Sequence, residues 1–151
     1  MPYTTADGRR QLLQDLASAA GQLADALASL TEAYERMDED SADRLEAELF
    51  RPVQAALGSA RRTYSEFAGR YDLARHDFAT SGPGLPQDAT ASVEQAIDAL
   101  EEADESLAEL QDSMLPVEVG DQEVRAGLSH IRELIAPLPA RARDLLRTLG
   151  R

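Results

Sequence analysis

Carboxylates are the side chains of this sequence whose number and spacing come closest to a chemical function. Between Ser81 and Val124 the chain has no lysine or arginine. The acids of this segment fall on the side of a helix opposite its apolar positions, at about 100° per residue. Because a face of one charge sign attracts groups of the other sign, three kinds of group are candidates to neutralise it: arginines of the same chain, a basic partner protein, and divalent cations held weakly by the clustered carboxylates. We favour the basic partner protein. The predicted partner-binding residues are Glu94, Asp98, Glu101, Glu105, Glu109 and Asp112.

Residues 101–105, Glu-Glu-Ala-Asp-Glu, resemble the acidic Glu-Glu-x-x-Glu element of the all-α MazG-type nucleotide pyrophosphohydrolases. The resemblance implies a metal-dependent nucleotide hydrolase that holds magnesium with carboxylates. The implied metal ligands are Glu101, Glu102, Glu105, Glu109 and Asp112. Such a site requires acids that converge across the interior of a bundle, whereas helical spacing turns these acids outward. We therefore favour a solvated acidic face, expect no cofactor, and keep the hydrolase as an alternative.

Two tyrosines stand four residues before an aspartate, in Tyr3-x-x-x-Asp7 and Tyr34-x-x-x-Asp38. This spacing resembles the Tyr-x-x-x-Asp/Glu signal of type VII secreted helical hairpins. The resemblance implies a secreted helical protein, which is our second alternative. Those proteins also share a Trp-x-Gly turn, and this sequence contains no Trp.

The two histidines are the remaining candidates for metal or acid-base chemistry. A carboxylate-bridged di-iron bundle needs Glu-x-x-His pairs that project inward from two helices. His76 lies opposite the apolar stripe around it, and His130 lies on the flank of its helix with Glu133 in the reverse order. We expect two histidines that are solvated or at the rim of the core. Since the chain also lacks cysteine, and with it any thiolate nucleophile, we lean towards a protein that is not an enzyme.

The overall charge and hydropathy limit the partners. The 28 acidic and 15 basic residues give a net charge of −13. A protein that binds nucleic acid must neutralise phosphates with basic side chains, so we expect no nucleic acid. No apolar run approaches the roughly 18 residues of a membrane-spanning helix. Residues 1–10 also lack the apolar core of a signal peptide, so we predict a cytoplasmic protein without membrane insertion.

Two helical stripes make up the first half of the chain. From Leu13 to Met37 apolar residues recur at steps of three and four, which indicates a helix. A second stripe runs from Leu45 to Phe78 and keeps its phase across Pro52. We therefore expect a kinked or restarted helix at this proline, with Ser41 as its N-cap.

Two further stripes follow the break at Ser-Gly-Pro-Gly-Leu-Pro, residues 81–86. The third covers residues 93–114, with Asp88 or Thr90 as its N-cap, and the fourth covers residues 124–149 with Asp121 as its cap. Two prolines, Pro137 and Pro139, should kink or break the fourth helix near Ala136. Arginines on its flank are placed to pair with acids of the third stripe: Arg125, Arg132, Arg143 and Arg147.

These stripes predict an all-α protein, a single domain over residues 1–151. Helices joined by short connections pack most simply as an up-down-up-down antiparallel four-helix bundle. Its parts are a hairpin at about residues 9–80, a loop at 81–88, and a second hairpin at about 89–150. We expect Tyr34, Tyr64 and Tyr71 to lie in or near the core.

Self-association is left open by the sequence. Several apolar residues lie beside the main stripes and offer a wider face for a second copy of the chain: Leu12, Phe50, Leu57, Leu115 and Leu146. A homodimer and a monomer are equally compatible with the pattern. The function we favour is protein–protein interaction by a non-enzymatic helical bundle. The acidic surface is the contact we predict, and the kinked fourth helix is the alternative contact surface.

Overall fold

The computed structural model describes residues 4–81 and 88–149. Its elements are α1 (Thr5–Glu35), α2 (Glu39–Leu45), the π-helical segment η1 (Glu46–Phe50), α3 (Arg51–Arg70), α4 (Ala89–Asp112), α5 (Leu115–Glu118), α6 (Gln122–Ile135) and α7 (Leu138–Leu149). The described part of the chain forms no strand, so the predicted all-α class is confirmed.

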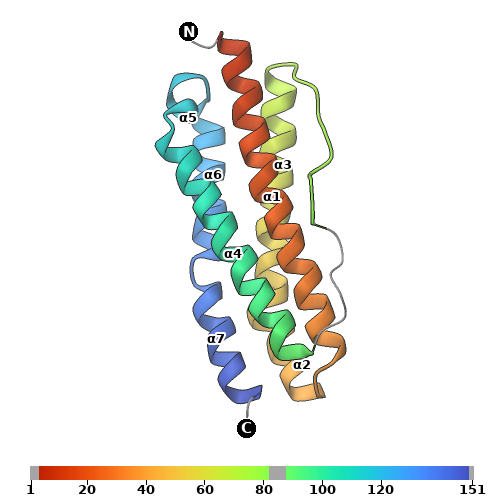
Figure 1. Ribbon diagram of the computed structural model, residues 1–151. Coiled ribbons are helices and arrows are strands. Elements are labelled where there is room, and N and C mark those ends of the chain that lie inside the picture. Colours follow the sequence, from red (N-terminus) through yellow and green to blue (C-terminus); the bar gives the residue numbers. More distant parts are fainter. Residues whose placement is uncertain (1–3, 82–87, 150–151) are drawn as a thin grey trace.

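The long helices form an antiparallel bundle (Figure 1). Here α1 packs against α4 and α3, α3 packs against α6, and α4 also packs against α6 and α7. Arg9, in the second turn of α1, lies over the ring of Tyr71 beyond the end of α3 and donates to the carbonyl of Val119 beyond α4. Both α3 and α4 therefore end beside the start of α1, and both run antiparallel to it.

The described residues form four rods, which are α1, α2 with η1 and α3, α4, and α6 with α7. Since α3 and α4 run in the same direction, the rods follow one another along the chain as down, up, up and down. The predicted up-down-up-down order is therefore wrong. The second helix ends at Arg70 instead of near residue 80. Asp72 adopts a φ of 53° there, and the Leu73 N–H donates to the Ala68 carbonyl at 2.9 Å. This is the end of a Schellman motif. It is built on Asp instead of the usual Gly, so the sequence carried no glycine signal for it.

Residues 71–81 are called the strap below. After the turn at residues 71 and 72, residues 73–81 run back along the bundle in extended form (Figure 1). The backbone N–H of His76 donates to the Tyr64 hydroxyl at 3.0 Å, and the N–H of Ser81 donates to Asp25 at 2.9 Å. A Cβ atom at Gly21 would lie 1.9 Å from the Ala79 carbonyl oxygen, so glycine permits this close approach. The predicted loop at 81–88 falls mostly at residues 82–87, outside the described residues.

Prolines shape the second and fourth rods. The second rod continues through Pro52, and η1 ends at Phe50, two residues before this proline. Pro52 has no N–H to offer the Glu48 carbonyl four residues earlier, and Arg141 of α7 donates to that oxygen at 3.2 Å. In the fourth rod, α6 ends at Ile135 and α7 begins at Leu138, which agrees with the predicted break near Ala136.

Side-chain caps start most of the helices. Asp88 and Asp121 accept hydrogen bonds from the backbone of α4 and α6, as predicted. The predicted cap at Ser41 is wrong, because Asp38 is the N-cap of α2 and accepts from the Ser41 N–H at 2.8 Å. This hydrogen bond lowers the pKa of the Asp38 carboxyl.

The core is built mainly of leucine and alanine from all four rods. Tyr64 is buried, with 4% of its surface exposed. Tyr34 is 42% exposed, so its predicted place in or near the core is wrong. The buried stripe passes instead from Leu30 to Ala33, one residue earlier on the helix.

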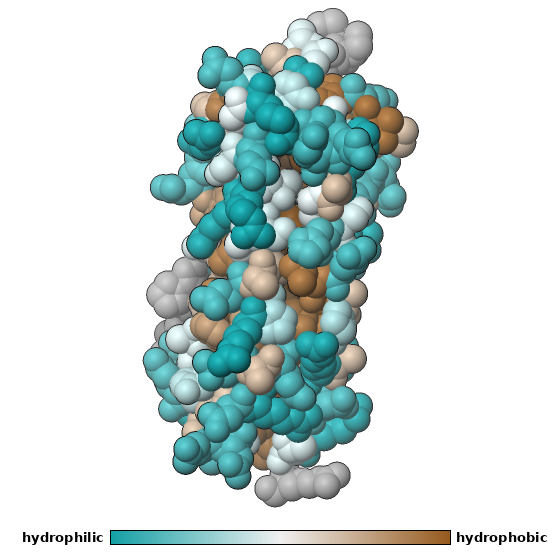
Figure 2. All heavy atoms as spheres, turned by 180° about the vertical axis from the view of Figure 1, so that it is seen from behind, coloured by the Kyte–Doolittle hydropathy of each residue, from teal (hydrophilic) through white to brown (hydrophobic). Residues whose placement is uncertain are grey.

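The apolar residues considered for a dimer face pack within the chain. Leu12 and Leu57 are buried, and Phe50, Leu115 and Leu146 are partly buried against the same core. Seen from behind, hydrophilic side chains cover most of the surface, and apolar ones show along the middle and at the end where α5 lies (Figure 2). Among the described residues, no helix has the length and apolarity needed to cross a membrane.

Candidate functional site

Helix α4 carries the predicted surface. Asp88 caps its first turn, and its apolar positions are buried against the rest of the bundle. We call the side opposite to them the α4 acidic face, and every residue in it is exposed. It consists of Glu94, Asp98, Glu101, Glu102, Glu105, Glu109 and Asp112.

Two acids of α4 pair with arginines of the fourth rod. Arg132 of α6 holds Asp104 through Nε at 2.9 Å, and Arg143 of α7 holds Glu101 at 3.1 Å. The hydrogen bond to Asp104 raises the pKa of the Arg132 guanidinium. Arginines of the fourth helix thus neutralise acids of α4, as predicted. They pair with Asp104, which lies beside the acidic face, and with Glu101, which belongs to it.

The other six residues of the α4 acidic face form no ion pair with any arginine of residues 4–81 and 88–149. Those ranges also contain no group of three or more His, Asp or Glu side chains placed to share a metal ion. Within residues 101–105, Glu101 and Asp104 turn to α7 and α6, Ala103 is buried, and Glu102 and Glu105 are exposed. The acids suggested by the MazG resemblance therefore lie on one exposed face of a single helix, and they form no such metal-holding group within the described ranges.

A cleft of about 540 Å³ lies between α4 and the break that separates α6 from α7. Its lining comprises Leu100, Glu101, Asp104 and Glu105 of α4, Arg132, Glu133 and Ile135 of α6, and Ala136 and Pro139 at the break. Leu100 and Ile135 are buried and form its apolar base. Sequence reasoning located the proline break but missed the cleft, because the cleft depends on how α4 lies beside α6.

A smaller cleft of about 380 Å³ lies between α1, α3 and the strap. Its polar lining includes Arg10, Gln14, His76 and Asp77, and the ring of Tyr64 also lines it. His76 and His130 are both exposed, as predicted. The lining mixes both charge signs, so it favours no particular class of ligand.

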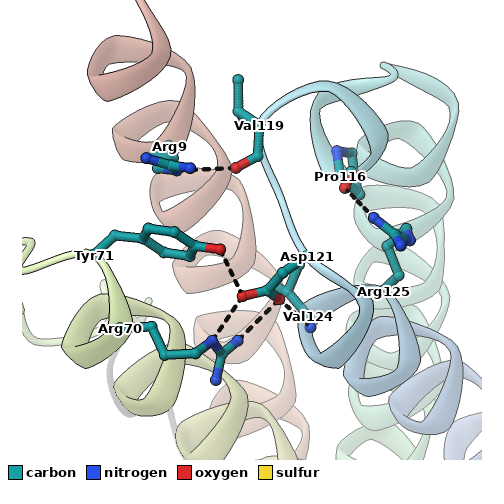
Figure 3. A network of polar contacts seen from close by, with 8 residues as sticks. All are labelled: Arg9, Arg70, Tyr71, Pro116, Val119, Asp121, Val124 and Arg125. Atoms are coloured by element: carbon teal, nitrogen blue, oxygen red, sulfur yellow. Dashed lines mark hydrogen bonds and ion pairs between the residues drawn. The ribbon is translucent and has the colours of Figure 1, made fainter.

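Asp121 is the centre of a polar network at the end of the bundle (Figure 3). Its carboxylate accepts two hydrogen bonds from Arg70, at 2.6 and 3.0 Å, one from Tyr71 at 2.9 Å and one from the Val124 N–H at 2.8 Å. Partial burial disfavours the charged carboxyl, but the bonds from Arg70, Val124 and Tyr71 outweigh it and lower the pKa of Asp121. The hydrogen bond with Asp121 also raises the pKa of Arg70 and of Tyr71.

This network has a positioning role. Asp121 joins the end of α3 to the start of α6, while Arg9 joins α1 to Tyr71 and to the turn at Val119. The network therefore fixes where α6 begins and how the start of α6 lies beside the end of α3. The sequence identified Asp121 as a cap but gave no sign of its pairing with Arg70, which is 51 residues away.

The motif that resembles the type VII signal has a local structural role. Asp38 caps α2, and Tyr34 is exposed one turn earlier. Asp7 pairs with Arg10 in the first turns of α1, and Tyr3 lies outside the described residues.

Comparison of the chain with protein-family models, with curated proteins and with solved structures found no match in any of the three.

Proposed function

We propose that this protein binds a basic partner protein through the α4 acidic face. The observation that supports this most is the set of six exposed carboxylates without an ion pair to any described arginine. They lie on one side of a 24-residue helix that contains no basic residue. A partner with lysines or arginines at matching positions would neutralise them.

Charge repulsion within α4 gives such binding a physical benefit. Like charges four residues apart, such as Asp98 and Glu102, each cost a helix about 0.2–0.5 kcal/mol. A bound cation removes this cost, and the negative field also speeds the encounter with a basic protein. The free helix therefore carries repulsion that a partner relieves.

The same charge argues against two other occupants of this face. A second copy placed there by two-fold symmetry would set the same carboxylates against each other. Nucleic acid would meet a protein of net charge −13. A basic protein is the class of partner that this face fits.

The test compares two triple variants of equal charge. D98N/E102Q/E109Q neutralises the face, and E35Q/D43N/E66Q neutralises three exposed acids elsewhere that form no ion pair with a described arginine. Each variant changes the net charge from −13 to −10. Partners are purified from the native cells with each protein and compared by quantitative mass spectrometry, and the recovered basic protein is then titrated directly.

We expect the wild type and E35Q/D43N/E66Q to bind the same basic protein, and D98N/E102Q/E109Q to bind it at least tenfold more weakly. Binding should also weaken as sodium chloride is raised, because salt screens exposed charges. If both variants bind that partner as tightly as the wild type, the α4 acidic face is not the contact.

A further inference from the structure

The cleft between α4 and the α6–α7 break adjoins the α4 acidic face, and Glu105 belongs to both. We infer that this cleft receives one arginine side chain of the basic partner. The inference rests on the proposed function and adds to it the chemistry of the central contact. The volume of the cleft, about 540 Å³, falls within the roughly 300–1,000 Å³ of typical ligand sites, so one long side chain fits.

Two carboxylates that line the cleft, one from α4 and one from α6, form no ion pair with an arginine in the described ranges. Asp104 is neutralised by Arg132, and Glu101 by Arg143. Glu105 on α4 and Glu133 on α6 have no such partner among the described arginines. The cleft thus keeps a net negative charge even though Arg132 contributes to its lining.

The end of α6 adds hydrogen-bond acceptors to the cleft. Pro137 and Pro139 have no N–H, so they donate no hydrogen bond to the carbonyls of Glu133 and Ile135 four residues earlier. Because Glu133, Ile135 and Ala136 all line the cleft, this helix end lies at the cleft itself.

Arginine fits these features better than lysine does. Its five N–H donors form a planar fork that can reach carboxylates of α4 and α6 and a carbonyl at once. Guanidinium is also more weakly hydrated than ammonium, so it enters a half-enclosed site at lower cost. Its methylene stem would pack on the apolar base formed by Leu100 and Ile135.

The direct test uses a small probe and the full chain. N-acetyl-L-arginine N-methylamide is titrated into the isotope-labelled protein, and backbone amide shifts are followed by NMR. We expect saturable shifts at Leu100, Glu105, Ile135 and Ala136, with a Kd on the order of 1 mM. The corresponding citrulline derivative, which is neutral and nearly the same shape, should cause no saturable shift there. A lysine derivative that binds as tightly would overturn the assignment to arginine.

Two variants challenge the site without altering the core. E105Q/E133Q removes both unpaired carboxylates, and Ala136→Phe fills the cleft from an exposed position. Each should weaken the arginine probe at least tenfold, about 1.4 kcal/mol. The control E35Q/E66Q also removes two exposed charges, from −13 to −11, and should leave the Kd unchanged. Equal affinity in all three variants overturns the inference.

The outcome is separable from that of the proposed function. Asp98, Glu102 and Glu109 do not line the cleft, and Ala136 is not on the α4 acidic face. If D98N/E102Q/E109Q and Ala136→Phe, assayed separately, each lose binding to the partner, both proposals are supported. If Ala136→Phe retains the partner and D98N/E102Q/E109Q loses it, the face binds the partner without the cleft, and the arginine inference fails alone.

Discussion

Asp121 illustrates how much one residue contributes to the frame around the candidate site. Its side chain, 16% exposed, caps α6 and at the same time bonds to Arg70 and Tyr71 at the end of α3. The cap follows from local sequence, because Asp before a helical stripe accepts a backbone N–H. The pairing with Arg70 depends on packing between distant segments, so no local pattern predicts it.

We expect Asp121→Asn to lower the free energy of unfolding by about 1–2 kcal/mol at pH 7, since Asn keeps the cap but loses the ion pair. The folded pKa of Asp121 is lowered, while an unfolded Asp titrates near 3.9. The charged carboxylate therefore contributes fully to the free energy of unfolding above the unfolded pKa. This contribution is lost as the pH falls through the folded pKa. Urea unfolding of wild type and variant across this range measures the change. A difference between them that stays constant down to pH 2 would contradict this account.

At the scale of elements, the strap is the feature that sequence reasoning missed. The apolar stripe continued through Phe78 with helical spacing, and Phe78 does pack against Tyr64. It does so from an extended segment, after Asp72 ends the helix with a positive φ. Periodicity therefore identified the contact but not the conformation. The α4 face, by contrast, followed directly from helical spacing because α4 is one unbroken helix.

Gly21→Ala tests how the strap is held. Alanine normally stabilises a helix interior by up to about 1 kcal/mol relative to glycine. At this position its Cβ would collide with the Ala79 carbonyl at 1.9 Å, so we expect the strap to detach while the helices remain. Trypsin cleavage after Arg75 should become faster, with little change in helical circular dichroism.

Gly58→Ala is the matched control. A Cβ atom added at Gly58 would lie 3.7 Å from Arg62 Nη1, which is an ordinary van der Waals distance. That variant should be as stable as the wild type or more so, with cleavage after Arg75 unchanged. If the two variants are cleaved at the same rate, the close approach at Gly21 does not hold the strap.

The charge of α4 also predicts a stability effect in the free protein. D98N/E102Q/E109Q removes several like-charge contacts at spacings of three and four, so we expect it to be more stable by up to about 1 kcal/mol at low salt. The gain should shrink in high salt, where exposed charges are screened. Thermal unfolding at two salt concentrations measures it. A variant that is less stable at low salt would show that these carboxylates are neutralised in the free protein.

At the scale of the whole molecule, the stripes predicted four rods, their antiparallel packing and the break in the fourth. The order of their directions was wrong, because it depends on the strap at residues 71–81 and not on the helices themselves. The cleft was missed for a similar reason, since Glu105 and Glu133 come from different rods. Local patterns therefore gave the parts, and long-range packing determined how charged groups meet.

The oligomeric state follows from how this packing uses the apolar residues. Leu12 and Leu57, which the sequence offered for a dimer face, are buried within the chain. Few large apolar side chains are exposed in the described ranges: Tyr34, Met114 and Val117. Tyr34 is near the end of α1, whereas Met114 and Val117 are at α5, beside the start of α1. Each copy carries a net charge of −13, which opposes association at low salt. We therefore expect a monomer in sedimentation velocity at low salt over a wide range of concentrations. A dimer that persists on dilution would contradict this, and a dimer that D98N/E102Q/E109Q strengthens would show that charge on α4 is what keeps the copies apart.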